Sequence, residues 1–181
     1  FNLITGGMSA DSGEVYLQGQ RIDRMPPWQR GHLGLGRTFQ LTRLFKDMTV
    51  QENVVAPLPD SRWRTMFADA VSGPEATRAD ELLDIVGLRR FAGERAGALS
   101  YGQQKLVDAA MAFMAGPDLV LLDEPAGGVN LTMLAHLKER LLAYNREHGT
   151  TFVVIEHNME FVMSLCTRII VLAQGRIICE G

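Results

Sequence analysis

Residues 118–125 read DLVLLDEP, and residues 152–157 read FVVIEH. Each stretch contains an uninterrupted apolar run with β-branched members, and a helix-length amphipathic segment separates the two. Parallel sheets that are covered on both faces are built from such runs. The sequence therefore predicts two buried parallel strands, at 119–122 and 152–155, in an α/β fold.

Acidic and titratable residues follow both predicted strands directly. Asp123 and Glu124 come after the first strand, and His157 comes after the second. Because ligands of open parallel sheets lie beyond the carboxyl ends of the strands, we expect these side chains to converge on one edge. Adjacent carboxylates beside a buried strand are costly unless a cation or a polarised water lies against them. A hydrated Mg²⁺ with a phosphate chain fits, the first carboxylate holding the metal and the second orienting a water.

A structural explanation of the same residues stays open. Asp123 and Glu124 would then be solvated charges that end a strand, and His157 would be a capping or packed histidine. The joint placement of all three at strand ends favours the ligand-binding interpretation.

The composition of the 181 residues bounds the class of protein. The length suits one large domain with an insertion, and the net charge of -3 gives no electrostatic footprint for nucleic acid. Cys166 and Cys179 lack the spacing of a zinc site or a disulfide framework, which fits a reducing, cytoplasmic setting. No apolar run approaches the ~20 residues of a membrane span, so we expect any membrane role to depend on a partner.

Helix signals dominate the middle of the chain. Thr49 and Glu52 have the spacing of a capping box ahead of a short helix. The segment 77–86 is typical of a helix, with Asp80 and Glu81 in its first turn. We therefore expect a helical insertion in the α/β frame.

The predicted organisation is an α/β core formed by residues 1–40 and 101–181, with a helical insertion subdomain at 41–100. Residues 60–73 are ambiguous. Residues 1–7 read as the last turns of a helix that a glycine pair closes, without a start signal or an initiator Met, so we expect a further segment upstream.

The last eighty residues carry clearer signals. Ser100 and Gln103 form a second capping box by spacing, and a helix should follow it. Another helix should end at His148 and Gly149, and a hairpin should close the chain. The residues that we expect to face inward are Leu106, Ala109, Ala110 and Phe113 in the first helix, Leu134, Leu137, Leu141 and Tyr144 in the second, and Met159, Val162, Met163 and Cys166 after Asn158.

At these separations the motifs resemble the nucleotide-binding subunit of ABC transporters, over essentially the whole chain. The resemblance implies a P-loop NTPase-like (RecA-like) parallel sheet with an ABC-type helical insertion, and it implies ATP and Mg²⁺ as ligands. The motifs that carry it are Gln40, the sequence LSYGQQ at 99–104, the strand and carboxylates at 119–125, the loop AGGVN at 126–130, and His157.

The resemblance also implies a role for each residue at the sheet edge. Asp123 would hold Mg²⁺ through water, and Glu124 would polarise the water that attacks the γ-phosphate. His157 would contact the γ-phosphate. Gln40 would reach the Mg²⁺ and the attacking water, although taken by itself it favours a polar residue at a strand end.

A second group of residues would act across a subunit interface. In the family, Ser100, Tyr101, Gly102 and Gln103 would bind the γ-phosphate held by the opposite subunit, because free amides and the helix dipole at a helix N-terminus favour an anion. Gly128 and Asn130 would lie in the loop that contacts the partner. Two structural readings stay open: Ser100 as a helix cap only, and Asn130 as the N-cap of the next helix.

Several stretches resemble the ATPase of branched-chain amino acid importers in particular. That resemblance implies a peripheral subunit on the cytoplasmic face of the inner membrane, paired with a second ATPase subunit and docked on transmembrane permease subunits, with a solute-binding protein as an indirect partner. Urea or amide importers, ABC ATPases that act on DNA or ribosomes, and a non-catalytic regulatory cassette are the alternatives. The stretches are 37–40, 44–45, 48–54, 99–104 and 156–162.

One family motif is not among these residues. The sequence contains no G-x-x-x-x-G-K-[ST] loop, whose lysine and amides bind the β- and γ-phosphates. In the family this loop precedes the helix whose end we place at residues 1–6, so we expect an N-terminal truncation. We therefore expect the 181 residues by themselves to bind ATP poorly, and the full-length protein to be a working ATPase.

Overall fold

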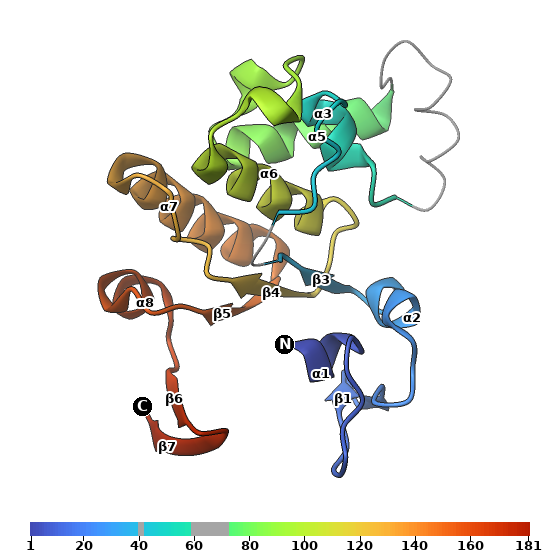
Figure 1. Ribbon diagram of the computed structural model, residues 1–181, viewed down its shortest axis with the longest axis vertical. Helices are drawn as coiled ribbons and strands as arrows, with labels where there is room; N and C mark the ends of the chain where they lie inside the picture. The colour runs from blue at the N-terminus through green and yellow to red at the C-terminus, as the bar shows by residue number, and fades with distance from the viewer. Residues whose placement is uncertain (40–41, 59–72) are drawn as a thin grey trace.

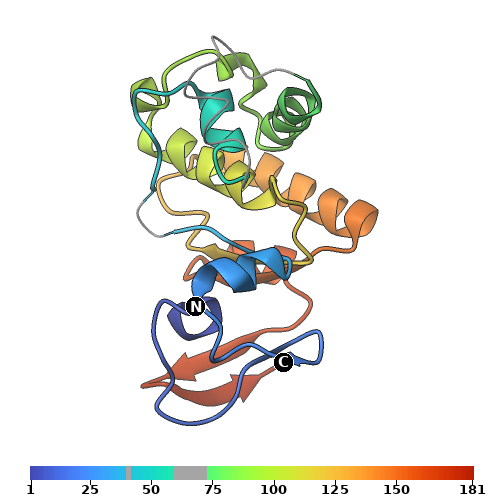
Figure 2. The ribbon, with the colours of Figure 1, turned by 90° about the vertical axis from the view of Figure 1, so that its right-hand side faces the viewer.

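A three-stranded parallel sheet lies at the centre of the computed structural model, which describes residues 1–39, 42–58 and 73–181. Its strands β3 (Leu35–Arg37), β4 (Leu119–Asp123) and β5 (Thr151–Ile155) are arranged in that order. Helices α6 and α7 cover one face, and the small hairpins lie beyond the other (Figures 1 and 2). The predicted parallel α/β core is confirmed.

The central strand β4 is buried as predicted, but β5 is not. Val120, Leu121 and Leu122 are fully buried in β4. In β5 alternate residues are exposed, Val153 by 40% and Ile155 by 45%. The expectation of a fully buried second strand is therefore wrong, because within the described residues β5 pairs with β4 alone and one of its faces stays uncovered.

The helical half contains α3 (Val50–Val55), α5 (Pro74–Ile85), the short 3₁₀ helices η1 (Arg89–Phe91) and η2 (Ala96–Ala98), and α6 (Tyr101–Phe113). The Thr49 and Glu52 capping box forms with both of its hydrogen bonds. Helix α5 starts three residues before the expected position, at a proline whose missing N–H costs nothing in the first turn. Asp80 and Glu81 therefore lie outside the first turn, where only Glu75 is acidic.

The two long helical signals after residue 100 are confirmed. In α6 and in α7 (Leu131–His148) all of the residues expected to face inward are buried. Gly149 ends α7 in the left-handed conformation, with φ 69°. Aromatic contacts join the two helices and the sheet, since the Phe113 ring lies 5.1 Å from Tyr144 and 5.8 Å from Phe152.

The inward face of α8 (Met159–Leu165) differs from the prediction. Phe161 and Val162 are buried, whereas Met159 and Met163 are exposed. Asn158 caps the helix by accepting a hydrogen bond from the Phe161 N–H. This cap and the packing of Phe161 set the rotation of the helix, which turns both methionines to solvent.

The remaining elements form the lower part of the molecule (Figure 2). They are α1 (Asn2–Thr5), the hairpin of β1 (Tyr16–Leu17) and β2 (Gln20–Arg21), α2 (Pro27–His32), and the hairpin of β6 (Ile170–Ala173) and β7 (Arg176–Glu180). The expected helix end at Gly6 is confirmed, with φ 79°. Arg30 is buried and donates hydrogen bonds to the Leu3 and Ile4 carbonyls at that helix end.

Both cysteines, Cys166 and Cys179, are free thiols. Among the helices of the described ranges, none is long and apolar enough to cross a bilayer.

Candidate functional site

The ends of β4 and β5 bring two of the predicted catalytic side chains, Glu124 and His157, together. Asp123 is in register with Ile155, and the Glu124 N–H donates to the Ile155 carbonyl at 2.9 Å. The His157 Nδ1 lies 4.0 Å from the Glu124 Oε1. Glu124 is partly accessible and His157 is largely so, which leaves this edge open to a ligand.

Glu124 has an unusual backbone conformation. Its φ of 49° lies in the left-handed region, which costs a non-glycine residue on the order of 1 kcal/mol or more. Its N–H is bound to β5, and its carbonyl accepts hydrogen bonds from the Lys105 Nζ at 2.7 Å and the Gly127 N–H at 3.1 Å. The backbone of Glu124, from which its carboxylate projects, is thus fixed by contacts on both sides of the residue.

Asp123 lies against strand β3. Its N–H donates to the Thr38 hydroxyl at 2.9 Å, and its Oδ2 lies 3.6 Å from the Arg37 Nη2, a loose ion pair. In the described residues no group of three His, Cys, Asp or Glu side chains could by itself hold a metal ion. A lone carboxylate fits Mg²⁺, because this ion keeps several waters and takes oxygens from substrate phosphates.

Gln40 lies outside the described residues, but the two residues before it are placed. The Thr38 N–H donates to the Leu121 carbonyl, and the Phe39 N–H donates to the Asp108 Oδ2, both at 2.9 Å. Burial raises the pKa of Asp108 to about 6, although the Phe39 N–H and the nearby Arg43 and Lys105 oppose the rise. The approach to Gln40 is thus bound to both β4 and α6.

The capping box at the start of α6 forms as predicted. The Ser100 hydroxyl accepts from the Gln103 N–H, and the Gln103 Oε1 accepts from the Ser100 N–H. Ser100 and Tyr101 are exposed, whereas Gly102 is buried. A Cβ at Gly102 would lie 2.4 Å from the Gly128 carbonyl oxygen, so this glycine is required by a contact inside the chain, whatever else binds there.

The loop 126–130 joins these parts. Gly128 has a φ of 75° and packs beside the Tyr101 ring. Asn130 is the N-cap of α7, since its side chain accepts from the Met133 N–H at 2.9 Å. The structural reading of Asn130 as a helix cap is therefore confirmed, and the cap leaves its side chain exposed.

Sequence reasoning missed Lys105, Asp108 and Glu156. Lys105 and Asp108 are polar residues on the otherwise apolar buried face of a predicted helix, and that contrast is the signal that could have found them. The Glu156 carboxylate accepts hydrogen bonds from the Ala126 N–H at 2.7 Å and from the N–H groups of His157 and Asn158 at 3.0 Å. It thereby ties the loop after β4 to the turn after β5.

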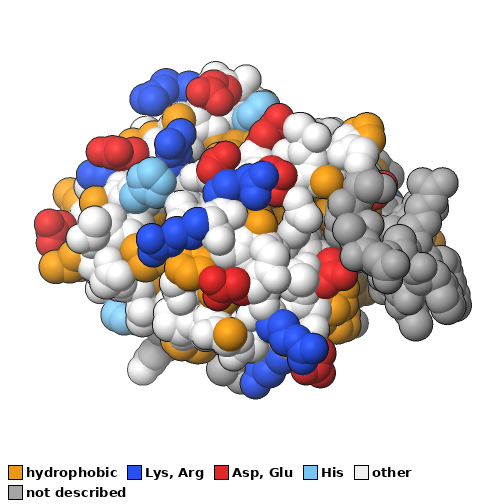
Figure 3. Space-filling view, turned by 90° about the horizontal axis from the view of Figure 1, so that it is seen from above, with side chains coloured by type: hydrophobic (Ala, Val, Ile, Leu, Met, Phe, Trp, Pro, Cys, Tyr) orange, Lys and Arg blue, Asp and Glu red, His pale blue; other side chains and the backbone are white. Residues whose placement is uncertain are grey.

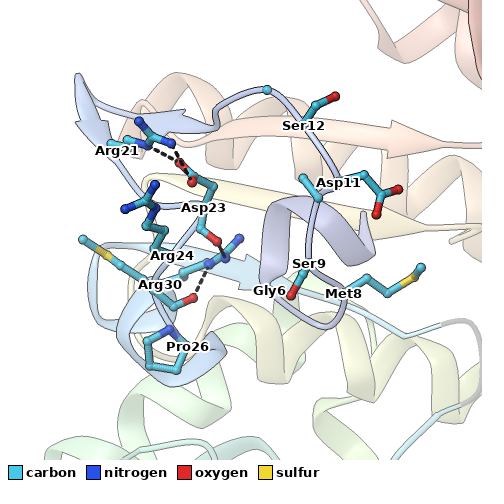
Figure 4. A pocket seen from close by; sticks show the side chains of 13 residues that line it. Gly6, Met8, Ser9, Asp11, Ser12, Arg21, Asp23, Arg24, Pro26 and Arg30 are labelled. Atoms are coloured by element: carbon cyan, nitrogen blue, oxygen red, sulfur yellow. Dashed lines mark hydrogen bonds and ion pairs between the residues drawn. The ribbon is translucent and has the colours of Figure 1, made fainter.

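A pocket of about 560 Å³ lies elsewhere, near the N-terminus. Figure 4 shows its two walls, one carrying Arg21, Asp23, Arg24 and Arg30 and the other carrying the loop at 8–12. None of the predicted site residues lines it. Arg30 donates its hydrogen bonds to backbone carbonyl groups, and Arg21 forms an ion pair with Asp23 at 2.7 Å, so the donors of both side chains already have partners within the chain.

The face of the helical half seen from above carries charges of both signs side by side (Figure 3). Lys and Arg side chains alternate there with Asp and Glu over the part of that face that the structure describes. No single basic field spans the described part of this view.

Comparisons with known proteins identify the family. A family model described as "ABC transporter" matches residues 1–127. The chain is 32% identical to the high-affinity branched-chain amino acid transport ATP-binding protein LivG of Escherichia coli K12, over 100% of this chain and 74% of the relative. It is 34% identical to the corresponding protein BraF of Pseudomonas aeruginosa, with the same coverage.

Solved structures agree with the sequence relatives. A nucleotide-free ATP-binding cassette from an ABC transporter superposes with a TM-score of 0.85 at 30% identity, over 99% of this chain and 73% of that one. The dimeric post-hydrolysis state of the cassette MJ0796, bound to ADP and Pi, gives 0.84 at 29% identity, over 99% and 77%. From its motifs, its fold and these matches, the chain belongs to the ABC transporter family, as part of an ATP-binding cassette.

Proposed function

We propose that this chain is the ATP-hydrolysing part of an importer for branched-chain amino acids. One observation carries the catalytic half of the proposal: the ends of β4 and β5 place the His157 Nδ1 4.0 Å from the Glu124 carboxylate, beside Asp123. The transport half is supported by relatives that are named for branched-chain amino acid transport and match the whole chain.

Within this proposal each residue at the edge has one task. Asp123 holds Mg²⁺ through water, and the ion neutralises charge on the phosphates. Glu124 polarises the attacking water, which typically contributes about 10²–10⁴-fold to the rate. His157 contacts the γ-phosphate, and its Nδ1 lies 4.0 Å from the Glu124 carboxylate, so both side chains face the same edge of the sheet. Gln40 reaches the same water and ion.

The second set of residues acts on the site of a partner ATPase subunit. Ser100, Tyr101, Gly102 and Gln103 present the N-terminus of the thirteen-residue helix α6, where amides and the helix dipole favour a γ-phosphate. Gly128 and Asn130 lie in the adjoining loop and contact the same partner. The exposure of Ser100, Tyr101 and Asn130 supports this assignment.

The remaining partners follow from the importer assignment. We place the protein at the cytoplasmic face of the inner membrane, where the insertion at 41–100 docks on the permease and the core at 1–40 and 101–181 hydrolyses ATP. The solute-binding protein contacts the permease only. Purification with a tagged permease tests this arrangement, and recovery with ribosomes or DNA instead would contradict it.

We further propose that residues 1–181 alone bind ATP weakly, because no phosphate-binding lysine loop is among them. Titration of these residues with a fluorescent ATP analogue in Mg²⁺ tests this. Tight binding would contradict the proposal.

Substitution of Glu124 in the full-length protein tests the catalytic assignment. Glu124→Gln keeps the side-chain shape but removes the charge that polarises water, so we expect kcat to fall by roughly 100-fold or more. ATP binding should persist, and a stable ATP-bound dimer should accumulate in size-exclusion chromatography. Glu139→Gln, at an exposed position of α7, is the matched control and should keep wild-type activity. An active, monomeric Glu124→Gln variant would contradict the assignment.

A further inference from the structure

Lys105 is a buried cation on helix α6, whose N-cap is Ser100. Lys105 is 8% exposed, and its Nζ donates a hydrogen bond to the Glu124 carbonyl at 2.7 Å. The ammonium also lies 5.6 Å from the centre of the Tyr101 ring. Burial of a lysine ammonium costs free energy unless its N–H donors have acceptors. The presence of a lysine at this position therefore calls for a functional explanation.

The partner of Lys105 is the strained residue of the site. Glu124 has a φ of 49°, and a backbone in this region persists only where its surroundings fix it. The strand β5 binds its N–H, while Lys105 provides the side-chain contact to its carbonyl. Loss of the ammonium would leave this carbonyl with the longer bond from the Gly127 N–H alone, which would loosen the peptide between Glu124 and Pro125 and thereby shift the carboxylate.

Gly127 leaves the space that the ammonium occupies. A Cβ at this position would lie 2.8 Å from the Lys105 Nζ and 3.4 Å from the Glu124 carbonyl oxygen. The φ of Gly127 is outside the left-handed region, so the backbone does not demand glycine. The absence of a side chain at 127 is therefore explained by the access of Lys105 to Glu124.

We propose that Lys105 is a positioning residue, which holds the Glu124 carboxylate in its hydrolytic orientation through the Glu124 backbone carbonyl. The inference rests on the proposed function of Glu124.

Steady-state kinetics of full-length variants test the proposal. Lys105→Met keeps the length of the side chain and removes the donor, so kcat should fall roughly 10- to 100-fold, while the KM for ATP changes less than about threefold. Lys105→Arg keeps a donor and should lose less. Lys138→Met, on α7, makes the same change at a lysine for which the described residues provide no hydrogen bond or ion pair, and it should leave kcat unchanged.

Gly127→Ala provides an independent test that keeps the lysine. Its Cβ would displace only the flexible end of Lys105, so the variant should fold and should lower kcat in the same way. Combined with Lys105→Met it should cause no further loss. A fully active Gly127→Ala variant together with a fully active Lys105→Met variant would overturn the proposal.

The Glu124→Gln background separates this inference from the proposed function. If Lys105 acts through Glu124, Lys105→Met should change the residual rate of Glu124→Gln by less than about twofold. An undiminished effect of Lys105→Met in that background would show that it acts elsewhere and would overturn the inference alone. If Glu124→Gln itself hydrolyses ATP at the wild-type rate, the proposed function fails, and the inference fails with it.

Discussion

Asp108 is a buried residue of α6 whose carboxyl group accepts a hydrogen bond from the Phe39 N–H. Burial raises its pKa from 3.8 to about 6. The folded protein therefore binds this proton more tightly than the unfolded chain. The stability that the protonated group contributes is fully present below pH 4 and is lost as the pH rises through about 6.

The variant Asp108→Asn should remove this pH dependence. When the pH is raised from 4.5 to 7.5, the wild type should lose about 2 kcal/mol of unfolding free energy through Asp108, and the variant should not show this loss. The asparagine side chain can still accept the Phe39 N–H. Urea unfolding of both full-length proteins at the two pH values measures the difference. Parallel pH profiles would show that Asp108 has an ordinary pKa.

Single residues were predictable where the signal was local. The Ser100 and Gln103 cap follows from a spacing of three residues, and the structure forms it. The contact between Lys105 and the Glu124 carbonyl joins residues nineteen positions apart and has no pattern of its own. Its prediction would have required knowing that the loop after β4 packs against α6.

At the scale of elements, the loop that precedes α3 depends on one buried side chain. Asn53 is fully buried, and its side chain accepts from the Phe45 N–H at 2.8 Å. It also donates to the Phe45 carbonyl at 3.0 Å and to the Thr49 carbonyl at 2.8 Å. These three bonds fix the loop against the first turn of the helix.

Replacement of Asn53 by Leu should therefore destabilise the full-length protein by about 2–3 kcal/mol, because buried backbone groups lose their partners. Urea unfolding gives the change. Gln51→Leu is the control on the same helix: it loses one partly exposed bond to Asp80 and should cost less than about 1 kcal/mol. Equal stability of the two variants would mean that the loop finds other partners.

The sequence predicted whether an element is a helix or a strand, but it did not always predict which of its faces are buried. The apolar pattern of 152–155 indicates a strand, and β5 forms there. The pattern cannot report how many neighbours the strand has, and for this reason burial on both faces was the wrong expectation. The same limit applies to α8, where the cap and packing decided which apolar residues face inward.

At the scale of the whole molecule, the sequence predicted the order of motifs and their convergence on one sheet edge, since parallel strands share an edge for their carboxyl ends. It did not predict which strand neighbours which, because pairing depends on contacts far apart in the chain. The short strand β3, Leu35–Arg37, contains Gly36 and no apolar run that would predict a strand. Close packing of Gly36 against α6 and Pro117 explains the glycine.

The exposed apolar surface of the lower half leads to a final prediction. Residues of β6 and β7 are exposed along their whole length, including Leu172 at 64% and Ile177 at 62%, and β5 has an unpaired edge within the described residues. Exposed apolar strands and free edges favour association between chains. Residues 1–181 expressed alone should therefore self-associate between roughly 1 and 100 µM, as measured by light scattering.

A paired substitution shows whether the hairpin is responsible. Leu172 and Ile177 face each other across β6 and β7, so Leu172→Lys with Ile177→Glu replaces an apolar pair by a favourable ion pair and keeps the hairpin. This variant should remain monomeric at higher concentration than the unmodified chain. Met8→Lys, at an exposed methionine outside the hairpin, should not change the association. If the unmodified chain is monomeric over this whole concentration range, these strands do not mediate association between chains, and the prediction is wrong.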